Sequence, residues 1–131
     1  MTLKKFLTGS ALLLFFIASP IFANDTNSAA FYSEGCSAFS REEWDSAVFL
    51  LRQTVSDPAF NTADANYMLI TAEIYAGDEK SALSDCDEYL NSFPNSFYYS
   101  RIQYTKGKLL YKLKEYEKAI ITYTGRCQRH L

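Results

Sequence analysis

Residues 93–123 read FPNSFYYSRIQYTKGKLLYKLKEYEKAIITY, and this stretch decides the fold. Its apolar residues recur every three to four positions, which is the spacing of amphipathic helices. The segment FPNS at its start is a turn whose last residue, Ser96, can cap the helix that follows. Gly107 and Ala119 are small, so two antiparallel helices can approach closely at these positions. The stretch therefore predicts a helical hairpin.

The same hairpin pattern recurs earlier in the chain, in a register without gaps. A first hairpin and the last one share small and bulky residues at matched spacing, because Gly35, Trp44, Ala47 and Leu51 recur as Gly107, Tyr116, Ala119 and Tyr123. A middle unit, with the turn after Tyr75 shortened, carries Ala72, Tyr75, Gly77, Ala82, Tyr89 and Pro94. The small residues let helices approach and the bulky ones fill the space beside them. We expect repeats at about 28–61, 62–96 and 97–131, the last one incomplete.

Turn and capping residues divide this region into six expected helices. Asp57-Pro58 ends the second helix near Ser56, because proline lacks an amide hydrogen and restricts the residue before it. Thr62 and Asp78 are N-caps, and Gly77 suits a helix end. A capping box at residues 40–43 is expected to start the second helix. The other helices are expected at about 28–39, 63–76, 79–91, 97–113 and 115–124, and no strand pattern competes, which predicts an all-α fold.

The turn at residues 93–96 leads to Gly107, Tyr111 and the run Tyr116-Glu117-Lys118-Ala119-Ile120, and this segment resembles the tetratricopeptide repeat family. The family period is about 34 residues, and Ala47, Ala82 and Ala119 are 35 and 37 residues apart. Within the family, the segment is similar to periplasmic proteins of the Tol-Pal coordinator and outer-membrane barrel-assembly type. The resemblance covers about residues 28–124. It implies a tetratricopeptide-like α-solenoid of about three antiparallel helix hairpins that acts as a protein-binding scaffold.

In this family the first helix of each pair lines a concave groove that binds partner peptides. The resemblance then implies a lining of Tyr32, Cys36 and Phe39, then Asn66, Leu69 and Glu73, then Arg101, Tyr104, Lys108 and Tyr111. Tyrosines offer large contact area at low entropic cost. Arg101 and Lys108 can pair with carboxylates, so an acidic peptide is the expected ligand. Alternatively, some of these aromatic residues pack against neighbouring helices.

The first 23 residues predict a signal peptide. Lys4 and Lys5 precede a short apolar run, residues 11–17, and Ala23 suits the position before a cleavage site. An uncleaved membrane anchor is the alternative. The first cysteine is Cys36, well beyond the cleavage site, so the chain is not expected to be a lipoprotein and departs here from the barrel-assembly lipoproteins. We expect a periplasmic or secreted protein whose mature domain is residues 24–131.

Charge is unevenly distributed along the mature chain. Residues 24–96 hold 13 acidic and three basic residues, whereas residues 97–131 hold two acidic and eight basic residues. This asymmetry favours an oppositely charged partner, or head-to-tail contact between copies as a structural, self-associating unit. Solvated faces are the simpler interpretation.

Other functional classes lack the residues they need. The single histidine, His130, is next to the chain end and is poorly placed for acid–base catalysis. The acidic cluster Asp85, Asp87 and Glu88 lacks the loop of a calcium site. Basic residues among the tyrosines of residues 99–118 suit nucleic acid, but an exported protein does not meet it, and lysine-rich helix faces are commonly solvated. We therefore expect no enzymatic activity, no metal, no cofactor and no nucleic acid.

Three cysteines remain, Cys36, Cys86 and Cys127, and their odd number leaves at least one without an intramolecular partner. Cys86 is expected in the core, and Cys127 is a candidate for an intermolecular disulfide. Gly125 is expected to end the last helix early, without a closing helix. This predicts either a shortened form of a longer repeat protein or a last hairpin that docks on a partner.

Overall fold

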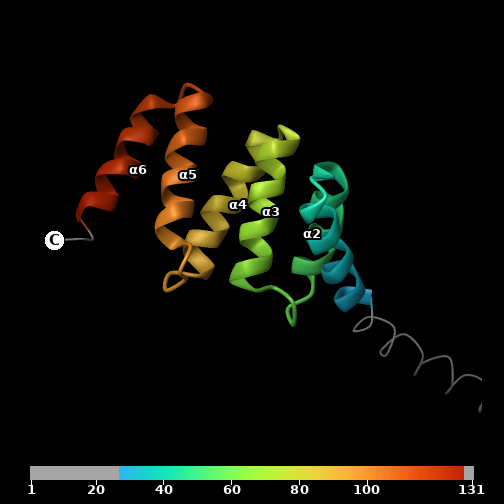
Figure 1. The fold of residues 1–131 in the computed structure, drawn as a ribbon. Helices are drawn as coiled ribbons and strands as arrows, with labels where there is room; N and C mark the ends of the chain where they lie inside the picture. Colours follow the sequence, from blue (N-terminus) through green and yellow to red (C-terminus); the bar gives the residue numbers. More distant parts are fainter. Residues whose placement is uncertain (1–26, 129–131) are drawn as a thin grey trace, which may run out of the picture.

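The computed structural model describes residues 27–128, with side chains as far as residue 125. The predicted signal peptide at 1–23 and His130 lie outside this range, as does the side chain of Cys127. Residues 27–128 form six helices and no strand, and neighbouring helices pack in sequence order as three antiparallel hairpins (Figure 1). The predicted all-α solenoid of three hairpins is confirmed.

The helix bounds lie close to those expected from the sequence, except at the end of the last helix. The first helix is described over residues 27–40. It is followed by α2 (Trp44–Ser56), α3 (Ala63–Ala76), α4 (Glu79–Ser92), α5 (Tyr99–Lys112) and α6 (Tyr116–Gln128). The prediction that Gly125 ends the last helix is wrong, because α6 continues through it to Gln128. A glycine inside a helix costs only about 1 kcal/mol relative to alanine, which neighbouring residues can offset.

The caps of the middle hairpin are those expected from the sequence. The Thr62 hydroxyl accepts a hydrogen bond from the Ala65 amide at 3.2 Å. The Asp78 carboxylate accepts one from the Ser81 amide at 3.1 Å. Gly77 has a φ of +84°, the left-handed conformation that glycine adopts without strain. Thr62 therefore fixes the start of α3, and Gly77 and Asp78 fix the turn between α3 and α4.

The predicted capping box at residues 40–43 is wrong. The Ser40 hydroxyl donates to the Cys36 carbonyl at 2.8 Å, one turn back in its own helix. The Glu43 carboxylate binds the Arg41 guanidinium at 2.8 Å, and no side chain caps α2. Ser96 is expected to cap a helix that begins at residue 97, but α5 begins at Tyr99. The Ser96 hydroxyl accepts a hydrogen bond from the Tyr98 amide at 3.1 Å, just before the helix.

All three hairpin turns have the same backbone hydrogen bond, which fixes the true register of the repeats. The amides of Glu43, Asp78 and Glu115 donate to the carbonyls five residues earlier, Ala38, Glu73 and Leu110, at 3.0, 2.9 and 2.8 Å. The residue before each of these amides has a positive φ: Glu42 at 60°, Gly77 at 84° and Lys114 at 64°. The hairpins are therefore related by 35 and 37 residues throughout, and the predicted shortened turn after Tyr75 is wrong.

This register places Ile70, and not Ala72, at the position of Gly35 and Gly107. Ile70 packs within its own hairpin against Ala82 and Cys86 of α4. Ala72 instead packs on the preceding hairpin, in a cluster with Ala47 and Leu51 of α2. Tyr75 also faces α2, where its ring stacks on Trp44 with centroids 4.6 Å apart. Ala72 and Tyr75 therefore make contacts between two hairpins, and not contacts between the two helices of one hairpin.

The core is divided into two clusters, one at each junction between hairpins. The first contains Ala38, Ala47, Leu51, Leu69 and Ala72. The second contains Ile70, Ala82, Cys86, Tyr89, Ile102 and Leu109. Cys86 is fully buried, as expected. Polar contacts add to the second junction, where Lys106 and Lys112 of α5 form ion pairs with Asp87 and Glu79 of α4. Part of the charge asymmetry is therefore neutralised inside the molecule.

Candidate functional site

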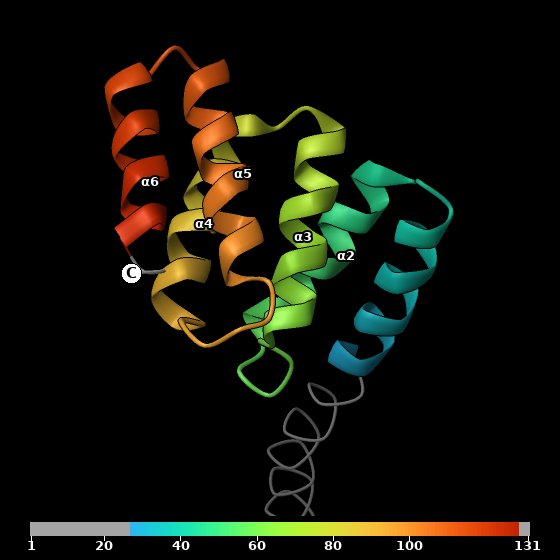
Figure 2. The same cartoon turned by 60° about the vertical axis from the view of Figure 1, so that its left-hand side comes forward.

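A tyrosine occupies the same position in the first helix of every hairpin. With the register fixed by the turns, Tyr32, Tyr67 and Tyr104 are equivalent. They lie on the first helix, α3 and α5, which share one side of the solenoid, with α5 drawn over α4 and α3 over α2 in Figure 2. We call these three residues the tyrosine ladder. They form the candidate binding site.

Each ladder tyrosine contacts another aromatic ring that lies later in the chain. The ring of Tyr67 stacks on Tyr98, with centroids 4.0 Å apart and planes 9° apart. Two looser pairs join Tyr32 to Phe60 at 6.5 Å and Tyr104 to Tyr123 at 6.0 Å. These contacts hold the rings while leaving part of each exposed; Tyr104 keeps 47% of its surface. Fixed, partly exposed tyrosines lose little entropy on binding.

Charge changes sign along the ladder. One turn before each tyrosine the equivalent residues are Ala29, Asp64 and Arg101, and one turn after it they are Cys36, Thr71 and Lys108. Burial, then Cys36 and then Asp64 raise the pKa of Tyr32 above its ordinary value. At the other end Arg101 donates to the Tyr67 hydroxyl at 3.0 Å, and the Lys108 ammonium lies 5.7 Å from the centre of the Tyr104 ring. The α5 end of the ladder is therefore basic.

Two other predicted groove residues lie beside the ladder, in equivalent positions near the hairpin turns. Phe39 is half-buried and meets Trp44 edge-on at 5.5 Å. Tyr111 is 65% exposed and meets Tyr116 edge-on at 5.2 Å. The middle member of this row is Ile74, which packs against the second core cluster. The row extends the apolar part of the ladder face toward the turns.

Three predicted groove residues of α3 are placed elsewhere. The Asn66 side chain amide donates to Asn61 at 2.6 Å and to the Thr62 carbonyl at 2.8 Å, so it ties down the start of its helix. Leu69 is buried against α2. Glu73 is fully buried and faces α2 and α4. The prediction that Glu73 and Leu69 line an open groove is wrong, because the corrected register turns both into the packed side of α3.

Glu73 belongs to a charged cluster that connects three successive helices. Its carboxylate forms an ion pair with Arg52 of α2, and Arg52 also lies 3.8 Å from Asp85 of α4. Burial, followed by the hydrogen bond to Asp85, raises the pKa of Glu73 to about 8. Glu73 Oε2 and Asp85 Oδ2 are buried oxygens without a hydrogen-bond donor. A single proton shared between the two carboxyl groups satisfies both oxygens.

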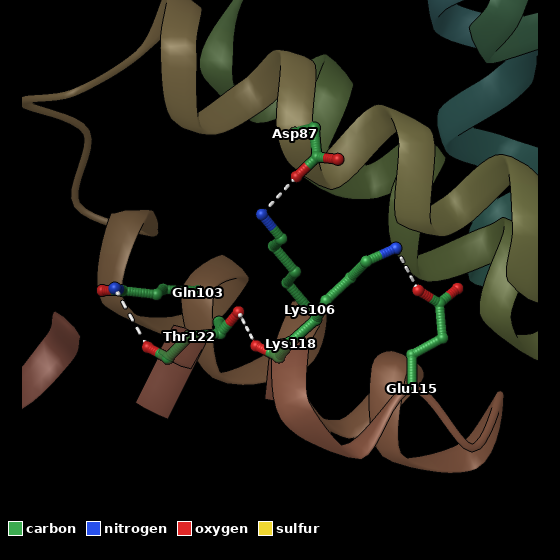
Figure 3. Close-up of polar contacts among 6 residues, drawn as sticks. All are labelled: Asp87, Gln103, Lys106, Glu115, Lys118 and Thr122. Carbon is green, nitrogen blue, oxygen red and sulfur yellow. Dashed lines mark hydrogen bonds and ion pairs between the residues drawn. The ribbon is translucent and has the colours of Figure 1, made fainter. Parts of the chain in front are cut away.

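The register gives this cluster an open counterpart between α4 and α6. There Asp87, Leu110 and Thr122 take the places of Arg52, Glu73 and Asp85, and they line a shallow hollow. Figure 3 shows its charged groups engaged with one another: Lys106 reaches Asp87, and Lys118 reaches Glu115. Gln103 of α5 donates to the Thr122 carbonyl at 3.4 Å. These charged groups of the hollow already have partners within the chain. The hollow is therefore a weaker candidate for a binding site than the tyrosine ladder.

Sequence reasoning missed Tyr67. The signal was available in the spacing, because Tyr32, Tyr67 and Tyr104 are 35 and 37 residues apart, as are Ala47, Ala82 and Ala119. The match of Tyr67 is hidden because the small residues Gly35 and Gly107 suggest a small counterpart in α3. The nearest small residue there is Ala72, whereas the true counterpart is Ile70. Aligning Ala72 with the two glycines shifts the predicted register of α3 by two residues. This shift places Asn66, Leu69 and Glu73 on the groove side in the prediction.

Over residues 27–128 no helix has the length and apolar character needed to cross a membrane. Within the same range, no group of three or more histidine, cysteine or acidic side chains is arranged to hold a metal ion. The chain matches no protein-family model, and no curated protein matches it. The assignment of the tyrosine ladder as a candidate binding site therefore depends on the geometry of its own residues.

Proposed function

We propose that the protein is a binding scaffold whose tyrosine ladder receives an extended segment of another protein. The observation that carries this proposal is the recurrence of a half-exposed tyrosine at one position of all three hairpins. Tyrosine supplies apolar area, a hydroxyl group and little loss of entropy, which suits protein recognition. A row of such residues across three parallel helices is a surface matched to an elongated ligand.

The basic end of the ladder favours a ligand that carries a carboxylate. Arg101 and Lys108 are exposed on α5, on either side of Tyr104. Arginine binds carboxylates with two parallel hydrogen bonds, which adds direction as well as attraction. Asp64 at the middle hairpin would repel the same group. We infer that an acidic side chain or a terminal carboxylate of the ligand lies over α5.

A peptide display experiment tests this proposal directly. Peptides selected on the purified protein are measured by fluorescence anisotropy, each with a free carboxylate and with an amidated C-terminus. The double variant Arg101→Ala and Lys108→Ala is expected to weaken the binding of acidic peptides at least tenfold, which corresponds to about 1.4 kcal/mol of binding free energy. Lys80→Ala, an exposed lysine of α4 away from the ladder, is the matched control. Selected peptides that bind the double variant as tightly as the wild type would contradict the proposal.

We also propose that the protein is an exported member of the tetratricopeptide family and helps to assemble or organise complexes of the cell envelope. Residues 1–23 support export by their sequence alone, and the repeating hairpins support the family. Mass spectrometry of the protein recovered from the periplasm is expected to show a chain that begins at Asn24. A chain that retains residues 1–23 in the membrane fraction would favour the uncleaved anchor.

A further inference from the structure

Successive hairpins are joined in one way throughout the described chain. The second helix of one hairpin receives the first helix of the next, so α3 packs on α2 and α5 packs on α4. Val48 of α2 and Leu83 of α4 occupy equivalent positions, and each packs against the core cluster of its junction. On the helix that is received, Leu69 and Ala72 of α3 are buried against α2. These contacts define the shape of a junction.

The outward face of α6 has the side chains of such a junction but is uncovered in the described chain. Ile120 is the equivalent of Val48 and Leu83, yet it is 62% exposed. Tyr116, the equivalent of Trp44, is also exposed. Covering an exposed isoleucine removes apolar surface from water, which favours association. The face is therefore suited to one more helix of the first-helix type.

The first helix of the chain presents the complementary face. Ala30, Glu34 and Ser37 are exposed, and their equivalents in α3 are Ala65, Leu69 and Ala72, which are buried. Both helices thus carry small residues at the two outer positions of this face, and in α3 both of these residues are fully buried. The first helix can therefore approach α6 as α3 approaches α2. At the central position Glu34 takes the place of Leu69, so this interface would be less apolar than the junction of α2 and α3.

Charge also favours contact between the two ends of the molecule. Residues 27–62 contain five acidic and two basic residues, whereas residues 97–128 contain two acidic and seven basic residues. The hairpin turns all lie at the same end of the solenoid (Figure 1). Continuing the row would bring Glu42 and Glu43 of a second molecule next to Lys114 of the first, and all three residues are exposed. Oppositely charged turns would meet.

We propose that α6 receives the first helix of a second copy of the chain, so that copies associate head to tail and continue the solenoid. Such an interface is heterologous, because each copy contributes a different face. It does not use the tyrosine ladder, so it stands independently of peptide binding. Each added copy would lengthen the row of ladder tyrosines by three.

Sedimentation velocity under reducing conditions tests the proposal with one variant for each face. The wild type is expected to associate as its concentration rises and to dissociate as salt is added. Ile120→Glu on α6 and Ala30→Arg on the first helix should each weaken association at least tenfold. Both positions are exposed, so circular dichroism is expected to show unchanged helix content. Ile121→Glu, at the exposed neighbouring position that corresponds to Phe49, is the matched control.

Mixing the two variants gives the decisive result. The Ile120→Glu chain keeps its first-helix face, and the Ala30→Arg chain keeps its α6 face. The mixture is therefore expected to form a one-to-one complex that grows no further. A wild type that remains monomeric at every concentration would leave the α6 face to a different protein and overturn the proposal. Variants that associate like the wild type, or a mixture that forms no complex, would overturn it as well.

Discussion

Gly107 lies directly beneath the ring of Tyr123, as Gly35 lies beneath the side chain of Leu51. A Cβ atom at residue 107 would lie 2.5 Å from Cε1 and Cζ of Tyr123, and one at residue 35 would lie 3.1 Å from Cγ and Cδ2 of Leu51. Both pairs are separated by 16 residues and occupy the same place in their hairpins. The absence of a side chain at these glycines lets the paired helices approach closely. The same relationship at both ends of the solenoid confirms the equivalence of the first and third hairpins.

Replacing Gly107 tests whether close approach or backbone freedom sets the need for glycine. Gly107→Ala is expected to destabilise the protein by about 1 kcal/mol, because the crowding at Tyr123 exceeds the gain in helix propensity. In a Tyr123→Ala background the side chain that would meet the new methyl group is gone, and the same substitution should be neutral or stabilising by about 0.5 kcal/mol. Urea unfolding of the four variants in a double-mutant cycle measures this difference. An equal effect in both backgrounds would show that Tyr123 does not set the constraint.

Trp44 is the only tryptophan of the chain, so its fluorescence reports on one junction. Its ring stacks on Tyr75 of the next hairpin, with centroids 4.6 Å apart and planes 19° apart. Tyr75→Ala is expected to expose the indole, shift its emission to longer wavelength and destabilise the protein by about 1 kcal/mol. Tyr111→Ala, which removes a similarly exposed ring from α5, should leave the emission unchanged. An unchanged spectrum of the Tyr75 variant would argue against the stacked pair.

The helix ends could be predicted from the sequence, because each capping signal depends on only a few adjacent residues. Thr62, Gly77 and Asp78 carry their own capping chemistry, and the structure uses all three as expected. The register of the middle hairpin was not local. The turns at Glu42 and Lys114 adopt positive φ without glycine, which is uncommon, so their equivalence to Gly77 was hidden in the sequence.

The charged cluster was also beyond sequence reasoning. Glu73 occupies the position that holds Ala38 and Leu110 in the other hairpins, where periodicity alone predicts an apolar residue. Its partner Arg52 lies 21 residues away and on a different hairpin. Only tertiary packing shows that Glu73 and Arg52 meet, whereas the sequence alone predicts Glu73 in an open groove. The error follows from the predicted register of α3, in which Ala72 and not Ile70 is aligned with Gly35 and Gly107.

The buried thiol of Cys86 should be much less reactive than that of Cys36. Burial and the neighbouring carboxylates raise the pKa of Cys86 to about 12, so at pH 8 the unreactive thiol form prevails. Cys36 is half-buried and therefore reachable. In a Cys127→Ser background, we expect a thiol reagent to modify Cys36 in the folded protein and Cys86 only after denaturation. Rapid modification of both residues in the absence of denaturant would mean that α4 opens readily.

The raised pKa of Glu73 predicts that stability falls with rising pH. The pKa is about 8 in the folded protein and about 4.3 in an unfolded chain. Between these values the folded state binds more protons, so the free energy of unfolding decreases as pH rises from about 4.3 through 8. Glu73→Gln keeps the shape but cannot ionise, so it is expected to flatten this decline and to be more stable than the wild type at pH 9. Urea midpoints measured from pH 5 to pH 9 provide the comparison, with the exposed Glu88→Gln of α4 as the control. A decline of equal slope in the Glu73 variant would place the titrating group elsewhere.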